Sequence, residues 1–265
     1  MKTVIFLVAA VTTLGISSPI DADNDAIAKG EAIAREWDSR DRGFGDTMTT
    51  LNMILENRQG RISKRRLRIN VLEVADEKDG DKSLVVFEEP RDIKGTALLS
   101  FSHVHGPDDQ WLYLPALKRV KRISSSNKSG PFLGSEFAYE DISSQELMKF
   151  DYIWLRDEAC GDFECFVLEQ RPRYENSGYT RQIAWYEMDE YRLHRIDYYD
   201  RKNVLLKTLT FSDYRQYLDQ YWRAHDMHMA NHQTGKTTRL MYDQFQFRSG
   251  LTDKDFTQNR LKRTR

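Results

Sequence analysis

The most informative segment of the sequence spans residues 90–142 and reads PRDIKGTALLSFSHVHGPDDQWLYLPALKRVKRISSSNKSGPFLGSEFAYEDI. It contains two expected strands, Ile93–Ser102 and Gln110–Leu114, which the turn residues Gly-Pro-Asp-Asp at 106–109 separate. A third strand is expected at Val120–Ser124. The segment shows no nucleophile elbow of the form Gly-x-Ser-x-Gly and no other obvious catalytic set. The segment therefore predicts strands and turns of the fold and does not predict a catalytic site.

A loop rich in glycine and serine follows the third strand at residues 124–135. It leads toward a helix that is expected at Glu140–Asp151, with Ser143 or Ser144 as the cap. The apolar side of this helix would consist of Ile142, Leu147 and Phe150.

Alternating apolar and polar residues on both sides of this segment predict a long antiparallel sheet. In residues 63–74, for example, Leu67, Ile69 and Val71 face one way and polar residues lie between them. Seven further strands are expected after residue 151, separated by turn residues, and a helix is expected before the sheet at Asp23–Arg40. The fold class is mainly β (α+β).

A sheet of ten or more strands tends to curl. With few helices to cover it, a curled sheet leaves an apolar concave face, which must be filled by helices, side chains or a ligand. The apolar concave face is therefore the feature of the expected fold that points toward a function.

Residues 1–22 are expected to be a cleavable secretory signal peptide. Lys2 precedes an apolar run at residues 4–16, which is shorter than the about 20 residues that a membrane-spanning helix needs. An uncleaved membrane anchor is the alternative. Residues 23–265 are then expected to form a single domain of an exported protein, because turns but no long linker interrupt the strand pattern.

The two cysteines, Cys160 and Cys165, lie close together in the sequence CGDFEC. In an exported protein this spacing predicts a disulfide at the tip of a hairpin. A metal site is the weaker alternative, since no histidine or second cysteine pair lies nearby in sequence. The formal net charge of −1 gives no reason to expect a nucleic-acid partner.

Few residues suggest catalysis or a cofactor. The sequence TGKTT at 234–238 lacks the leading glycine of a phosphate-binding loop and lies between two expected strands, so a hairpin turn is the better interpretation. His103 and His105 would point to the same face of a strand, which leaves a metal-dependent hydrolase as a minor alternative. We expect no catalytic residues, no metal and no cofactor.

The strongest local charge feature is a basic run that directly follows the second expected strand of the opening segment. It is either a solvated edge that discourages strand addition or a docking surface for an acidic partner or an anionic lipid headgroup. The candidate docking residues are Lys118, Arg119, Lys121, Arg122 and Lys128.

Together with the signal peptide and the strand pattern, three segments carry a resemblance to a known family: DIKGTALLS at 92–100, DDQWLYLPALKRVKRISSSNKSGPFLGSEFAYED at 108–141, and YWRAHDMHMANHQTGKTT at 221–238. The chain resembles the outer-membrane lipoprotein-sorting protein family of the LolA-like superfamily. The resemblance implies a strongly curved, unclosed antiparallel half-barrel covered by a few helices, with a cavity for acyl chains. It also implies a periplasmic, non-catalytic carrier in outer membrane biogenesis that binds a lipid or a lipoprotein.

The same resemblance implies a membrane partner, with an inner-membrane exporter of the resistance–nodulation–division type as one candidate. The loop at 124–135 would then be the part that moves at the mouth of the cavity. The alternative is an interaction module that assists such an exporter and fills its own cavity with side chains. We expect a monomer. The candidate cavity residues are the strand positions Leu84, Val86, Leu98, Phe101, Leu112, Leu114, Ile183, Trp185, Leu209 and Phe211.

Overall fold

The computed structural model describes residues 19–74 and 79–263. The expected signal peptide at residues 1–22 therefore falls outside the described residues, apart from its last four positions. Those positions begin helix α1 (Pro19–Asp41). Among the described residues, no helix is both long enough and apolar enough to cross a membrane.

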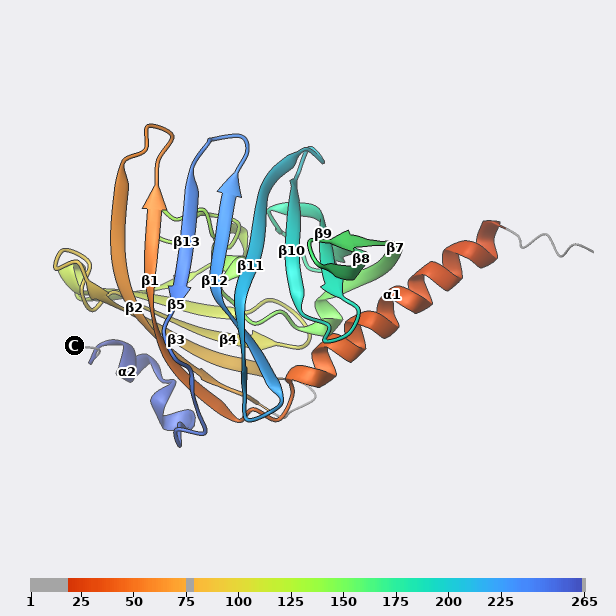
Figure 1. Cartoon of the computed structure of the whole chain (residues 1–265). Coiled ribbons are helices and arrows are strands. Elements are labelled where there is room, and N and C mark those ends of the chain that lie inside the picture. The colour runs from red at the N-terminus through yellow and green to blue at the C-terminus, as the bar shows by residue number, and fades with distance from the viewer. Residues whose placement is uncertain (1–18, 75–78, 264–265) are drawn as a thin grey trace, which may run out of the picture.

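A single antiparallel sheet dominates the structure (Figure 1). Its strand order is β6-β5-β4-β3-β2-β1-β13-β12-β11-β10-β9-β8-β7, and the short strand β14 pairs with β1 off this path. The strands are β1 (Asp46–Glu56), β2 (Ile62–Leu72), β3 (Asp79–Glu89), β4 (Ala97–His103), β5 (Asp109–Leu114), β6 (Arg119–Ile123), β7 (Phe150–Cys160), β8 (Phe163–Pro172), β9 (Tyr179–Glu187), β10 (Leu193–Asp200), β11 (Leu205–Tyr217), β12 (Tyr221–Asn231), β13 (Thr237–Tyr242) and β14 (Gln246–Phe247).

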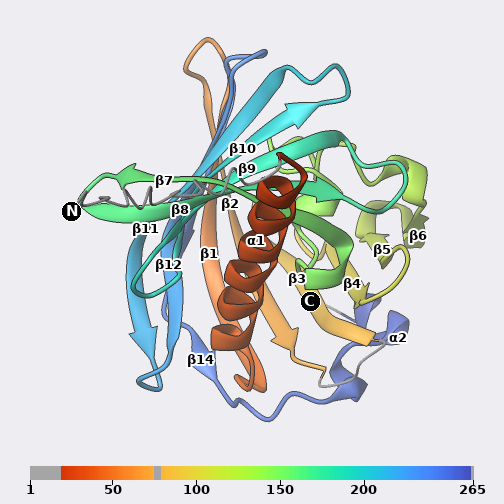
Figure 2. The ribbon, with the colours of Figure 1, turned by 90° about the vertical axis from the view of Figure 1, so that its right-hand side faces the viewer.

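The sheet curves strongly but does not close, since β6 and β7 form its two edges and do not pair with each other (Figures 1 and 2). The prediction of a curved, unclosed antiparallel sheet with few helices is confirmed. The hairpin between β7 and β8 also carries the predicted disulfide between Cys160 and Cys165, whose Cα atoms lie 5.9 Å apart. That prediction is confirmed as well.

The chain must cross the open side of this half-barrel once, because β6 and β7 are consecutive strands at opposite edges of the sheet. Residues 124–149, which we call the crossing segment, make this connection. The prediction of a helix at Glu140–Asp151 is wrong. The structure has only two short 3-10 turns there, Tyr139–Asp141 and Leu147–Lys149, and β7 begins at Phe150. The carboxylates of the first turn bind other parts of the chain, so tertiary contacts replace a helix.

Helix α1 packs along the edge strand β7 (Figure 2). Gly30 permits this close approach, because a Cβ atom there would lie 2.7 Å from the backbone nitrogen of Trp154 and 2.8 Å from the carbonyl oxygen of Tyr152. One edge of the sheet is thus covered by the helix.

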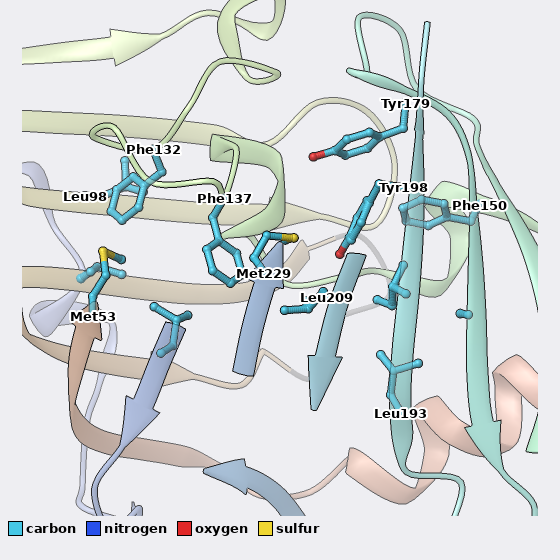
Figure 3. Close-up of a cluster of buried hydrophobic side chains, with 14 of the residues drawn as sticks. Met53, Leu98, Phe132, Phe137, Phe150, Tyr179, Leu193, Tyr198, Leu209 and Met229 are labelled. Carbon is cyan, nitrogen blue, oxygen red and sulfur yellow. The ribbon is translucent and has the colours of Figure 1, made fainter. Parts of the chain in front are cut away.

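The buried side chains form separate clusters. The main cluster includes Phe132 and Phe137 of the crossing segment, and Figure 3 shows both rings reaching toward Leu98, Met53 and Met229 of the strands. We call the face of the sheet that meets the crossing segment the concave face. The cluster on the opposite, convex face of β2–β5 is covered by the C-terminal segment with α2 (Gln258–Leu261) and comprises Leu84, Val86, Ala97, Leu99, Phe256 and Leu261.

Candidate functional site

The larger of two apolar cavities lies between the end of α1 and the concave face, with a volume of about 580 Å³. This volume falls within the range of roughly 300–1,000 Å³ that is typical of pockets for small organic ligands. Aromatic and aliphatic side chains from α1 and several strands form the walls, among them Trp37, Ile69, Phe211, Tyr214, Trp222 and Met227.

The smaller cavity lies beneath the crossing segment and has a volume of about 210 Å³. Phe132, Phe137 and Ile142 cover it from the crossing segment, and strand residues such as Met53 and Leu67 form its floor. The two cavities are neighbours, because they share four lining residues. We call them together the concave trough; the shared residues are Ile69, Val71, Met227 and Tyr242.

Most of the charged residues at the rim of the larger cavity are paired. The Arg192 guanidinium donates to both carboxylate oxygens of Glu187 at 2.7 and 2.8 Å. Burial alone would raise the pKa of Glu187, but the hydrogen bonds from Arg192 and His194 outweigh it and hold this pKa below its ordinary value. The Arg192 guanidinium also lies 4.5 Å from the centre of the Trp222 ring, so the cation and the aromatic wall stabilise each other.

A second ion pair joins α1 to β12 at the same rim. Arg223 binds Asp41 at the end of the helix, and it also lies over the ring of Phe44. Burial of the carboxyl outweighs the attraction of Arg223, so the pKa of Asp41 is raised above its ordinary value. The cavity therefore has apolar walls and a rim in which charges of both signs compensate each other.

The crossing segment is anchored to the sheet by two adjacent carboxylates. Asp141 forms an ion pair with Lys207 of β11 and accepts a hydrogen bond from the Tyr179 hydroxyl at 2.9 Å. Glu140 accepts hydrogen bonds from the Gly178 backbone and the Ser177 hydroxyl, both at 2.8 Å. Burial and the neighbouring Asp141 nevertheless raise the pKa of Glu140. These contacts tie residues 140 and 141 of the crossing segment to Lys207 on β11 and to residues 177–179 around the start of β9.

The ten residues that were predicted as the cavity wall lie in different places. Phe211 lines the larger cavity. Leu98, Leu112 and Leu209 lie in the main cluster on the concave face, and Leu114 packs against it. Leu84, Val86 and Phe101 lie on the convex face beneath the C-terminal segment, and Ile183 and Trp185 form a third cluster with Cys165 and Val167.

The basic residues that were predicted as a docking surface also lie in two different places. Lys118, Arg119, Lys121 and Arg122 lie on or next to the edge strand β6. Lys128 lies apart from them in the crossing segment, 3.6 Å from the centre of the Tyr174 ring, and burial lowers the pKa of its ammonium group. The structure thus brings four of the five cations together at one edge of the sheet.

Tyr214 and Trp222 line the cavity, yet strand alternation does not identify them. On β11 the inward residues are Leu209 and Phe211, and the next inward residue by strict alternation would be Asp213. Asp213 instead has a φ of +50°, and Tyr214 points into the cavity. A left-handed residue in mid-strand gives only a weak signal in the sequence, because aspartate adopts this conformation occasionally and without a fixed motif.

Of the two histidines in the metal-site hypothesis, His103 has ordinary hydrogen-bond partners. The ring nitrogens of His103 lie 3.1 Å from Asp79 and 3.3 Å from Asp109. Within residues 19–74 and 79–263, no group of three or more histidine, cysteine, aspartate or glutamate side chains has an arrangement that would hold a metal ion.

Solved structures of other proteins match this chain over most of its length. A crystal structure described as an outer membrane lipoprotein-sorting protein domain from Vibrio parahaemolyticus is 56% identical, with a TM-score of 0.87 over 89% of this chain and 99% of that one. A DUF1329 family protein from Desulfovibrio piger is 29% identical, with a TM-score of 0.84 over 89% of this chain and 99% of that one.

A LolA superfamily protein from Nitrosomonas europaea shares the fold at 21% identity, with a TM-score of 0.70 over 87% of this chain and 98% of that one. A family model whose description is "uncharacterized protein" matches residues 79–263. No curated protein matches the sequence.

Proposed function

Since the chain belongs to the family of the outer membrane lipoprotein-sorting protein domain and has the LolA-like fold, we propose that it is a non-catalytic periplasmic carrier. It holds the acyl chain of a lipid or lipoprotein in the concave trough and passes this cargo to or from a membrane partner. The observation that carries the proposal is the trough itself, two neighbouring apolar cavities bounded by α1, the sheet and the crossing segment.

The free energies of burial and association favour a long acyl chain as the cargo. Burial of each methylene group contributes about 0.8 kcal/mol. Association costs roughly 4–15 kcal/mol in lost translational and rotational freedom. About ten buried methylenes are therefore needed before binding becomes useful, and short fatty acids do not suffice. The paired charges at the rim add little net charge, so the chain length and not the headgroup charge should dominate the affinity.

The experiment has two parts. The first is native mass spectrometry of protein purified from the periplasm without detergent, in which a bound lipid is expected. The second is titration with saturated fatty acids of 8 to 16 carbons, in which each two added methylenes should tighten binding roughly tenfold, until the trough is full. An affinity that does not depend on chain length would contradict the proposal.

A matched pair of variants ties the binding to the trough. Ala224→Trp adds a large side chain to the wall of the larger cavity and should weaken palmitate binding at least tenfold. Ala28→Trp places the same side chain on the exposed face of α1 and should leave binding unchanged. Equal loss in both variants would show that palmitate does not bind in the trough.

The rings of Phe132 and Phe137 favour a second candidate, because they already fill part of the concave face. In that case the domain is an interaction module that assists a membrane exporter without carrying lipid. Protein that neither retains lipid from the periplasm nor binds palmitate would support this candidate over the carrier.

A further inference from the structure

The two edges of the sheet differ in whether another segment covers them. At β7 the edge is covered by α1, which approaches the strand backbone at Gly30. At β6 the inner side pairs with β5 from Leu114↔Arg119 to Gln110↔Ile123. Within residues 19–74 and 79–263, the backbone of Arg119–Ile123 forms no hydrogen bond with any other segment. The outer side of β6 thus presents unpaired N–H and C=O groups, which is the geometry that accepts an added strand.

This open edge is densely cationic. Four of the five residues 118–122 are basic. Arg122 pairs with Asp109, whereas the exposed side chains of Lys118, Arg119 and Lys121 have no ion-pair or hydrogen-bond partner in the part of the chain that the structure describes. One lysine is enough to discourage edge-to-edge aggregation. Three unpaired cations on five residues repel one another and are complementary to a negatively charged partner.

The cations lie on both faces of the sheet. Lys121 is opposite Leu112, so it shares the concave face with that residue, and Arg119 shares this face by alternation. Arg122 is opposite Trp111, which packs in the cluster on the convex face. A flat anionic membrane would meet only one of these faces. A strand laid along the edge would meet both, because its own side chains alternate in the same way.

We propose that β6 binds an extended, acidic segment of a protein partner, which joins the sheet as an additional strand. Carboxylates on the concave face of that segment pair with Arg119 and Lys121, and a carboxylate on the convex face shares Arg122 with Asp109. Leu117, which is 62% exposed in the adjoining turn, provides an apolar contact. Cross-strand charge pairs are individually weak, which suits a transient contact. The inference does not depend on lipid in the trough.

The test uses a ten-residue peptide of the sequence EETTEETTEE, whose carboxylates lie on both faces of an extended strand, and the same peptide with lysine in place of glutamate. Isothermal titration should detect binding of the glutamate peptide only, and the affinity should fall as salt is added. Hydrogen exchange of the full chain should show new protection at the amides of residues 119–123. Binding without this protection, or binding of the lysine peptide, would overturn strand addition.

Two triple variants with equal charge changes control for non-specific attraction. Lys118→Glu, Arg119→Glu and Lys121→Glu together should weaken peptide binding at least tenfold. Arg58→Glu, Arg61→Glu and Lys64→Glu, three exposed cations at the β1–β2 end, should not change it. Equal loss in both triple variants, or no loss in either, would overturn the proposal.

Vesicles of phosphatidylglycerol form the last arm of the experiment. Vesicle binding that requires the β6 cations, without binding of the glutamate peptide, would assign this edge to a membrane surface instead and overturn the proposal. Palmitate binding is measured on the same variants and should be unchanged. Failure of strand addition is therefore distinguishable from failure of the carrier proposal.

Discussion

The Nζ atom of Lys207 lies 2.6 Å from Oδ2 of Asp141, and each of the two side chains is only 4% exposed. Lys207 is on β11, and Asp141 ends the 3-10 turn Tyr139–Asp141 of the crossing segment. The ammonium group also donates to the carbonyl oxygen of Glu136 at 2.8 Å. This buried pair thus ties the segment that crosses the open side to the middle of the sheet.

Removal of one partner should be costly, because it leaves the other charge buried without compensation. We expect Lys207→Ala to lower the free energy of unfolding by about 3–5 kcal/mol, as measured by urea denaturation. Lys207→Met combined with Asp141→Leu removes both charges and should recover much of this loss. A double variant that is less stable than Lys207→Ala would contradict a purely electrostatic account of the pair.

Gly30 should be essential for the packing of α1 on β7. An alanine in an exposed helix is about 1 kcal/mol more favourable than glycine. At residue 30 we expect the opposite sign, because the new methyl group would meet the backbone of Tyr152 and Trp154. Thermal denaturation and hydrogen exchange of α1 should both show destabilisation.

The control for this substitution is Ala28→Leu, a larger change at an exposed position of the same helix. It should leave the exchange of α1 unchanged. Gly30→Ala protein with wild-type or greater stability would show that the helix can shift without loss.

The carboxyl of Asp81 should make stability depend on pH. Its burial raises the pKa from 3.8 to about 7. The folded protein then keeps a proton that the unfolded chain has already lost, so stability should fall as the pH rises from about 4 to about 7 and level off above that. At about 1.4 kcal/mol per unit, the contribution of this group is up to about 4 kcal/mol. Urea denaturation at several pH values measures it.

Asp81→Asn keeps an acceptor for the Val74 backbone N–H but cannot ionise. The variant should be more stable than the wild type at pH 8, and its stability should vary less between pH 4 and 7. The same pH dependence in both proteins would assign the effect to other groups.

Met227 belongs to the wall that both cavities share. Met227→Glu places a carboxylate without a partner among apolar side chains, so palmitate binding should weaken at least tenfold at pH 8. Binding should partly recover at lower pH, because burial favours the neutral acid. Met241→Glu, at a residue of the neighbouring strand that is 39% exposed, is the matched control and should bind palmitate normally.

The disulfide should contribute modestly to stability. Cys160 and Cys165 close a loop of only six residues, for which the chain-entropy model gives about 2 kcal/mol. Urea denaturation of the Cys160→Ser, Cys165→Ser double variant should show a loss of this size, with palmitate binding unchanged. A loss of binding would connect this distant hairpin to the trough.

Most of the strands could be predicted, because alternation depends on neighbouring residues in the sequence. It was harder to assign the strand residues to the concave or the convex face of the sheet. Leu84 and Val86 alternate as well as Val85 and Phe87 do, and all four are buried. The C-terminal segment covers the first two, and the main cluster contains the other two. When both faces of a strand are buried, its sequence does not reveal which face is concave.

The antiparallel strands, the disulfide, the basic run at 118–122 and the resemblance to a family all follow from the sequence alone. The role of residues 124–149, in contrast, depends on how the strands are arranged in space. Their glycines, serines and charges suggest a mobile loop and a helix. Because β6 and β7 lie at opposite edges, this segment must instead cross the open side of the half-barrel. Asp141 reaches its partner Lys207 across 66 positions of the chain, a distance over which local sequence patterns carry no information.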